Sequence, residues 1–552
     1  MARHTQTRPG IKDSTSSGVK QLTSARVVLP EVELKVLKKF PRGTGTAASA
    51  VWQGFAGSIM LLLGSFGVGW LASSSVLIRN PLFIVARTTP AAVIIATVLL
   101  CVGAALMLRG WLRLRQHLAP WDETSAPILK KALLLWVAPL MVTLPLFSRD
   151  SYAYIGQGRL MQQGLDPYTD GISALNNYFS LGPDTLWTEA PTPYGPLWLW
   201  LEHFAVLLPA GSPEIALIPF RIACLIGVVL LAIYIPKLAA RHGLNPHRAL
   251  WLVVLNPVVL INFVASVHND SLMLGLVVAG LYYASAKRPI LGILLVTASI
   301  AIKPITLIAL PFVGLLWAGS RAGWVRKFAI WAATLFISMG VMAVMGVMNG
   351  LGFGWLAALQ TPGTVWIWYA PVGLFSHTVG FVITLLGGAG GSVTDVIQTI
   401  GQGISILLVM VLAFWKIPIP AASGVALHGP DALDETRRYS QAVLRRMAWA
   451  FAVVVLMASM IQPWYMLWLL AFFAITGIEE GWQMRTVLYL TAFFTLIALT
   501  DQLSVFPWIP VVMVRTVAIV VGFACVLFIM FKDKATRGLF LTAKPEKAAE
   551  PA

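Results

Sequence analysis

The chain has 552 residues, of which 58% are hydrophobic and only 11% are charged, and its formal net charge is +17. Soluble domains carry about 25% charged residues, so this composition excludes an ordinary soluble protein and indicates a polytopic membrane protein. The positive charge does not require a nucleic-acid partner, because basic cytoplasmic loops produce the same excess in membrane proteins.

The apolar runs divide the chain into three parts. Residues 1–48 are polar and basic and lack the apolar core of a signal peptide, so we expect a disordered cytoplasmic tail. Residues 49–534 form one transmembrane domain, and residues 535–552 form a second cytoplasmic tail. The runs predict an all-α fold of about 14 transmembrane helices, at 51–72, 91–109, 131–147, 214–236, 249–266, 271–286, 289–302, 304–319, 328–349, 394–415, 447–462, 465–478, 485–504 and 508–531.

The distribution of basic residues predicts the orientation of these helices. With the N-terminus inside, all but seven of the 40 lysines and arginines fall on the inner side. Cytoplasmic loops carry such an excess, so we expect both termini to be cytoplasmic in a multi-pass plasma-membrane protein. The seven outer residues are Arg79, Arg87, Arg149, Arg159, Arg221, Lys303 and Arg515.

Two long segments, 148–213 and 350–393, are predicted to be extracytoplasmic loops. Each contains a short apolar stretch, Leu197–Ala210 and Gly380–Leu386, which we interpret as a re-entrant or interface-lying helix. The predicted helices around 271–319 are also short, and Lys303-Pro304 interrupts them. Short or broken segments at membrane depth usually line a cavity.

Ser148-Arg149-Asp150 stands where an apolar run ends and the first long outer loop begins. Ionisable groups beside a membrane are usually functional, so Asp150 is the candidate for the chemical step. We expect Arg149 to keep Asp150 ionised, as a general base requires. Residues 152–163 have helical potential, and Tyr154, four residues after Asp150, would share its helix face.

The loop that follows is rich in carboxylates, amides and aromatic residues, a composition that suits a sugar. Candidate sugar contacts are Asp166, Tyr168 and Tyr194. The alternative is an ordinary structured loop, because Gly, Pro and Asp also form turns.

Two further polar segments interrupt apolar runs on the outer side. His268-Asn269-Asp270 is either a set of ligand contacts at a cavity rim or a tight turn. Trp464 and Tyr465, in Gln462-Pro463-Trp464-Tyr465, either stack on a sugar or prenyl chain or anchor the chain at the interface.

Three outer cations, Arg221, Lys303 and Arg515, lie within apolar runs or at their ends. An isolated cation there is costly and should pair with an anion. Neighbouring carboxylates such as Asp270 are one candidate, and the phosphate of a lipid in the outer leaflet is the other.

Several other classes of protein are disfavoured. No phosphate-binding loop or dinucleotide motif is present, which argues against an enzyme that uses ATP or a nucleotide sugar. No cofactor is expected, and the sequence shows no recognisable metal-binding pattern. Calcium or magnesium bound by the loop carboxylates remains an alternative. A transporter or flippase for a lipid-linked sugar is the main alternative to an enzyme. Such a protein would concentrate carboxylates at the bilayer midplane, whereas the carboxylates here cluster in the predicted outer loops.

Taken together, these motifs resemble those of the actinobacterial polyprenyl-phosphomannose-dependent α-1,6-mannosyltransferases, which belong to the GT-C glycosyltransferases. The resemblance runs over about residues 51–531. It rests on Ser148-Arg149-Asp150 with Tyr154, Gly164-Leu165-Asp166-Pro167-Tyr168, Thr192-Pro193-Tyr194-Gly195-Pro196, His268-Asn269-Asp270, Lys303-Pro304 and Gln462-Pro463-Trp464-Tyr465.

The resemblance implies a GT-C fold and an inverting mannosyl transfer at the outer face of the membrane. The donor would be polyprenyl-phosphate-mannose, and the acceptor would be a lipid-anchored α-1,6-mannan, as in lipomannan and lipoarabinomannan assembly. Asp150 matches the family's general base, although two predicted helices precede the one that leads into it. The cations Lys303, Arg221 and Arg515 would receive the donor phosphate, and His268 would support them.

Overall fold

The computed structural model describes residues 45–208, 212–359, 366–416, 434–501 and 503–541. Helices are the only regular elements among these residues, so the prediction of an all-α fold is confirmed. The predicted tails fall mostly at residues 1–44 and 542–552, outside the described residues.

The helices follow the apolar runs in chain order. The first third of the chain forms α2 (Ala47–Val68), η1 (Val76–Arg79), α3 (Pro81–Thr88), α4 (Pro90–Leu118), α5 (Ser125–Leu140), α6 (Asp150–Gln162), η2 (Ile172–Ala174), η3 (Tyr178–Leu181), η4 (Thr185–Trp187) and α7 (Pro196–Leu207). The middle forms α8 (Pro213–Arg241), α9 (Pro246–Val253), α10 (Pro257–Leu260), the π-helix η6 (Ile261–Ala265), α11 (Asp270–Ser285), α12 (Pro289–Ile300), η7 (Pro304–Ala309), α13 (Leu310–Ala318) and α14 (Trp324–Met348). The last third forms η8 (Gly354–Leu359), α15 (Pro371–Leu385), α16 (Gly390–Phe414), α17 (Glu435–Met457), α18 (Tyr465–Ala474), α19 (Trp482–Asp501), α20 (Val511–Leu527), the π-helix η10 (Phe528–Lys532) and η11 (Arg537–Leu539).

Among the described residues, eight helices are long and apolar enough to cross a membrane, or nine if the bent pair Pro246–Val253 and Pro257–Ala265 is one span. Each of the fourteen predicted segments overlaps a helix, but α11, α12 and α18 are shorter than an ordinary span. The chain is therefore a polytopic membrane protein. The count of about 14 crossings stays a prediction.

Two apolar stretches are broken at proline. Pro257 has no N–H to donate, and the chain bends by 53° there, between α9 and α10. The side chain of Asn256 caps the second half by accepting from Val258 N at 3.0 Å. The predicted interruption at Lys303-Pro304 is also present, since α12 ends at Ile300 and η7 begins at Pro304.

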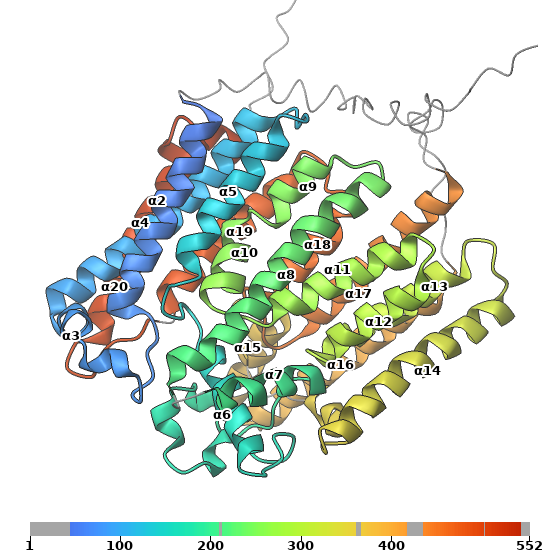
Figure 1. Cartoon of the computed structure of the whole chain (residues 1–552), viewed down its shortest axis with the longest axis horizontal. Helices are drawn as coiled ribbons and strands as arrows, with labels where there is room; N and C mark the ends of the chain where they lie inside the picture. The colour runs from blue at the N-terminus through green and yellow to red at the C-terminus, as the bar shows by residue number, and fades with distance from the viewer. Residues whose placement is uncertain (1–44, 209–211, 360–365, 417–433, 502, 542–552) are drawn as a thin grey trace, which may run out of the picture.

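The helices pack closely where glycine replaces a side chain. A Cβ on Gly57 of α2 would lie 2.5 Å from the carbonyl oxygen of Gly103 on α4. A Cβ on Gly227 of α8 would lie 2.2 Å from the carbonyl carbon of Ser271 on α11. These contacts hold α2 against α4 and α8 against α11, side by side in Figure 1.

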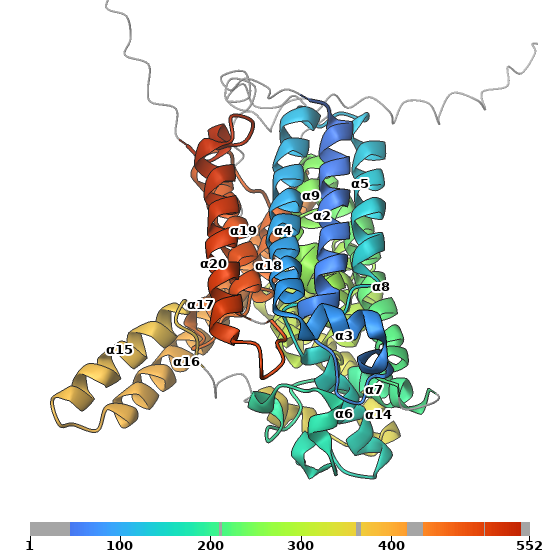
Figure 2. The same ribbon diagram turned by 90° about the vertical axis from the view of Figure 1, so that its left-hand side faces the viewer.

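The first long segment that is predicted to be extracytoplasmic covers one end of the bundle. Figure 2 shows α6 and α7 at the end opposite the start of α2, while the hairpin of α15 and α16 projects sideways. The apolar stretch predicted at Leu197–Ala210 corresponds to α7, a helix of 12 residues, and Gly380–Leu386 falls at the end of α15.

Candidate active site

Asp150 is the first residue of α6, where the helical bundle meets the segment, with α6 and α7, that covers one of its ends. Its N–H donates to the Oγ of Ser148 at 3.1 Å, which fixes the start of the helix. The N-terminus of a helix carries a partial positive charge and favours an anion there. The Asp150 side chain is 21% exposed, so a substrate can reach it. The prediction that Asp150 and Tyr154 share one helix is confirmed.

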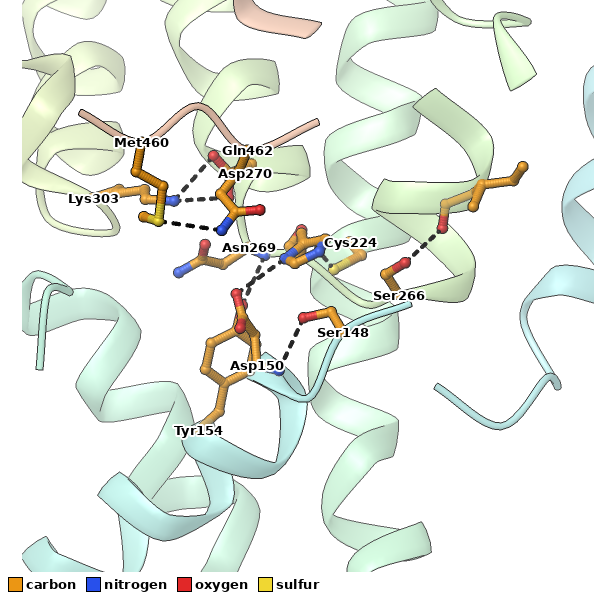
Figure 3. Close-up of polar contacts among 12 residues, drawn as sticks. Ser148, Asp150, Tyr154, Cys224, Ser266, Asn269, Asp270, Lys303, Met460 and Gln462 are labelled. Atoms are coloured by element: carbon orange, nitrogen blue, oxygen red, sulfur yellow. Dashed lines mark hydrogen bonds and ion pairs between the residues drawn. The ribbon is translucent and has the colours of Figure 1, made fainter. Parts of the chain in front are cut away.

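His268 lies directly against Asp150. Its Nδ1 is 3.2 Å from Oδ2 of Asp150, an ion-pair distance, although the ring is not aligned for a good hydrogen bond. The imidazole is fully buried and stacks on the Trp464 indole, with ring centroids 3.6 Å apart. The Sγ of Cys224 contacts the backbone oxygen of His268 at 3.2 Å (Figure 3). Packing therefore holds the imidazole beside the carboxylate.

Asn269 has a buried side chain whose polar atoms are unpaired. Its backbone N–H donates to the Tyr154 hydroxyl at 3.3 Å, yet both polar atoms of its fully buried side chain lack a partner. The indole N–H of Trp464 is also buried without a partner. Buried polar groups are normally hydrogen-bonded, so these groups are suited to a polar ligand beside Asp150.

A buried ion pair joins Asp270 to Lys303. The Nζ of Lys303 lies 2.9 and 3.1 Å from the two carboxylate oxygens, and the Trp468 indole N–H donates to Oδ1 at 2.9 Å. The ammonium lies 5.3 Å from the Tyr465 ring centroid. Lys303 is thus enclosed by α11 and α18, as Figure 3 shows for its pairing with Asp270.

The Thr192–Pro196 motif supports this ion pair through its backbone. Gly195 N–H donates to the carbonyl oxygen of Ile302 at 2.9 Å, and Leu197 N–H donates to that of Ala301 at 2.8 Å. A Cβ on Gly195 would lie 2.6 Å from the Ala301 carbonyl, so the two segments can approach this closely only because residue 195 is glycine. The motif therefore positions the segment that carries Lys303.

The surroundings of Asp150 favour its charged form. Burial raises the pKa of this carboxyl, but contact with His268, the charge of Lys303 and the hydroxyl of Ser148 outweigh burial. The pKa of Asp150 therefore lies below its ordinary value, and the group is ionised at neutral pH. This is the state that a general base needs.

The prediction that Arg149 keeps Asp150 ionised is wrong. The Arg149 guanidinium lies over the Trp70 ring, 3.7 Å from its centroid, and donates to the backbone oxygen of Pro183. Contact with His268 and the charge of Lys303, both distant in sequence, lower the pKa of Asp150 instead. An adjacent residue was the wrong choice because side chains at i and i+1 of a helix do not face one another.

Two other predicted cations do not join the site. Arg221 donates to the backbone oxygens of Leu140 and Val264 at 3.3 and 3.4 Å, and also to that of Thr143. It therefore stabilises the end of α5. Arg515 lies on α20, which packs against α4 and α19 at the left of Figure 1. Of the three predicted phosphate ligands, the structure brings only Lys303 close to Asp150.

The loop residues have mixed roles. Asp166 forms a turn, because its Oδ1 accepts from Tyr168 N at 2.9 Å. The Tyr168 ring is buried against Gly354, and its hydroxyl lacks a partner. Tyr194 packs edge-on against Tyr154, with ring centroids 5.3 Å apart, and so supports the position of the Tyr154 ring.

Sequence reasoning missed Trp468, which donates to Asp270. Its spacing gave a signal, since Trp468 follows Trp464 by four residues and shares its helical face. Within the described ranges, no group of three or more His, Cys, Asp or Glu residues is placed to hold a metal ion.

Comparison with known proteins assigns the chain to a family. Residues 51–319 match the family model described as the N-terminal domain of alpha-(1->6)-mannopyranosyltransferase. Alpha-(1->6)-mannopyranosyltransferase A of Mycobacterium tuberculosis is 31% identical, over 78% of this chain and 80% of that protein. A probable alpha-(1->6)-mannopyranosyltransferase of Mycolicibacterium smegmatis is also 31% identical, over 79% and 80% of the two chains.

More distant relatives cover a similar share of the chain. Alpha-(1->6)-mannopyranosyltransferase B of Corynebacterium glutamicum is 24% identical, over 80% of this chain and 75% of that protein. No solved structure matches. The matched segment holds Asp150, His268 and Lys303, and the similarity to the Mycobacterium tuberculosis protein covers 78% of the chain, more than this segment. The chain therefore belongs to the family of the actinobacterial alpha-(1->6)-mannopyranosyltransferases.

Proposed function

We propose that this glycosyltransferase transfers mannose from a polyprenyl-phosphate-mannose donor to a lipid-anchored α-1,6-mannan, with Asp150 as the general base. The observation that carries the proposal is the ionised Asp150 carboxylate beside the unpartnered polar atoms of Asn269 and Trp464. A sugar offers hydroxyls for these atoms and C–H faces for the indole. The family supports the type of reaction, and the geometry supports the proposed roles.

The proposed chemical step balances as an inverting displacement. Asp150 takes the proton of the acceptor 6-hydroxyl as that oxygen attacks the anomeric carbon of the donor mannose. The new bond joins the acceptor oxygen to the anomeric carbon, and the bond from that carbon to the phosphate oxygen breaks. A β-linked donor then yields an α-mannoside, and the prenyl phosphate leaves with the bonding electrons.

Lys303 is our candidate for stabilising the leaving phosphate. A lysine ammonium has three N–H donors, and the two contacts to Asp270 leave capacity for a phosphate oxygen. A preorganised cation at the place where charge develops lowers the barrier. The rings of Tyr465 and Trp468, which flank the Lys303 ammonium, hold it in place.

We place this reaction on the outer face of the membrane, in a GT-C fold with both termini cytoplasmic. The charge asymmetry of the sequence supports this orientation. The position of α6 and α7, at the end of the bundle opposite the start of α2, supports this placement (Figure 2).

The proposal predicts the donor. The purified protein in nanodiscs should extend an α-1,6-linked mannose oligosaccharide when supplied with a prenyl phosphomannose, and it should release prenyl phosphate. NMR of the product should show a new α-1,6 linkage. GDP-mannose should support no transfer. Transfer from GDP-mannose alone would contradict the proposed donor, and movement of the lipid across the bilayer without product would favour a flippase.

His268 should control the pH dependence of the reaction. In His268→Gln, Asp150 loses a partner that lowers its pKa, so this pKa should rise. The reaction needs ionised Asp150, so the acid limb of kcat/KM should move to higher pH and activity should recover partly in alkaline buffer. The control is His203→Gln, on the outer helix α7. An unchanged acid limb in His268→Gln would contradict the role of this pair.

A further inference from the structure

Two buried residues beside the candidate base have a left-handed backbone. Phe147 has φ +58° and stands three residues before Asp150, and Val267 has φ +61° and immediately precedes His268. Non-glycine residues rarely adopt positive φ, and a β-branched residue such as Val267 is a genuine outlier there. Both the base and its buried partner therefore follow a strained residue.

The two strained residues lie on segments that are joined directly. Leu146 N–H, just before Phe147, donates to the carbonyl oxygen of Ala265 at 3.2 Å. Ala265 ends the π-helix η6, and π-turns are frequent at functional sites. Val267 is fully buried and Phe147 is 6% exposed, so neither residue can relax toward solvent. A single backbone bond thus ties the approach to Asp150 to the approach to His268.

Val267 lies at a helix end, because it follows the C-cap Ser266 of η6 and the His268 N–H donates back to the Asn262 carbonyl at 3.3 Å. Lys287 has positive φ, at +63°, at the matching position after α11, where Arg288 N–H donates to the Tyr283 carbonyl at 2.9 Å. Left-handed residues are common at that position, but they are usually glycine or asparagine, whereas Val267 is β-branched. Phe147 and Val267 also precede the functional residues, within the buried core, which Lys287 does not.

Strain of this kind destabilises the folded state and persists only where the surrounding structure enforces it. We infer that Phe147 and Val267 are positioning residues, whose left-handed backbone and shared Leu146–Ala265 bond fix the contact between Asp150 and His268. This inference rests on the proposed function, in which Asp150 is the base. It assigns a role to two apolar residues that do not themselves touch the substrate.

A matched pair of substitutions tests the role of the left-handed backbone. Val267→Ala and Val267→Gly both remove the buried isopropyl group, but only glycine adopts positive φ without strain. V267G should therefore unfold at a temperature equal to or above that of V267A. If the left-handed backbone positions His268, V267A should also be about tenfold slower in kcat than V267G, because alanine favours a negative φ that moves His268, and misplacement by a fraction of an ångström is costly.

Control variants make the result decisive. Lys287→Ala and Lys287→Gly should show the same order of unfolding temperatures, with kcat unchanged, because Lys287 lies at the other end of α11. The Phe147→Ala and Phe147→Gly pair repeats the test if the Val267 variants do not fold. A kcat for V267A equal to or above that of V267G would overturn the inference. Asp150→Asn in the same assay tests the proposed base separately, since full activity there overturns the base alone.

Discussion

Replacing Asp150 with asparagine should abolish mannosyl transfer while leaving the protein folded. Asparagine keeps the shape of the side chain, and the contact to Ser148 uses the backbone N–H, so the start of α6 should survive. The amide cannot accept the proton of the acceptor hydroxyl. General-base catalysis contributes about 10²- to 10⁴-fold, and kcat should fall by that factor. The measurement is the initial rate with a prenyl phosphomannose donor at saturating acceptor.

A second carboxylate provides the control for this substitution. Asp395 is exposed on α16, and Asp395→Asn removes the same charge away from Asp150. It should keep the normal rate. Thermal unfolding in detergent should give similar midpoints for both variants. A normal rate for Asp150→Asn would exclude Asp150 as the base, whereas a low midpoint would show that it acts in folding.

Much of the fold could be predicted from sequence because the bilayer imposes a simple rule. Every backbone group in the hydrocarbon region needs an internal partner, so a long apolar run becomes a helix. All fourteen predicted segments overlap helices for this reason. Their number of crossings could not be predicted, because α11, α12 and α18 are short and their depth depends on packing against neighbours.

The local parts of the site could also be predicted from the sequence. The spacing of Asp150 and Tyr154 predicted a shared helix, and Lys303-Pro304 predicted a break, because both features depend on neighbouring residues. The partners of the charged side chains could not be predicted from the sequence. Arg149 lies on Trp70, and His268 lies on Asp150, through contacts between segments far apart in the chain. The sequence offered both a carboxylate and a phosphate as partners of Lys303, and the structure supplies the carboxylate.

The pairing of Lys303 with Asp270 leads to the second large effect that we expect. Lys303→Met should destabilise the protein, because it leaves the Asp270 carboxylate, only 1% exposed, without its cation. Removing one partner of a buried pair costs about 3–5 kcal/mol. The double variant Asp270→Asn/Lys303→Met removes both charges and should recover much of the loss, since a neutral replacement of a buried pair is often tolerated. Thermal unfolding of both variants provides the measurement.

An exposed ion pair gives the matched comparison. Arg321 and Glu435 are 2.9 Å apart, but the Arg321 side chain is 88% exposed. Water already solvates such a pair, so Arg321→Met should leave the unfolding temperature unchanged. An equally small effect of Lys303→Met would show that the Asp270–Lys303 pair does not stabilise the fold.

The same variants separate a structural role of Lys303 from a role in binding the donor phosphate. If the ammonium binds phosphate as well as Asp270, the double variant should regain stability but not donor affinity. Its KM for the prenyl phosphomannose should then rise more than its KM for the acceptor, because only the donor carries phosphate. A double variant with normal stability and a normal donor KM would leave Lys303 as the partner of Asp270 alone. The leaving phosphate would then have to be stabilised by uncharged donors, for which the unpartnered groups of Asn269 and Trp464 are the nearest candidates.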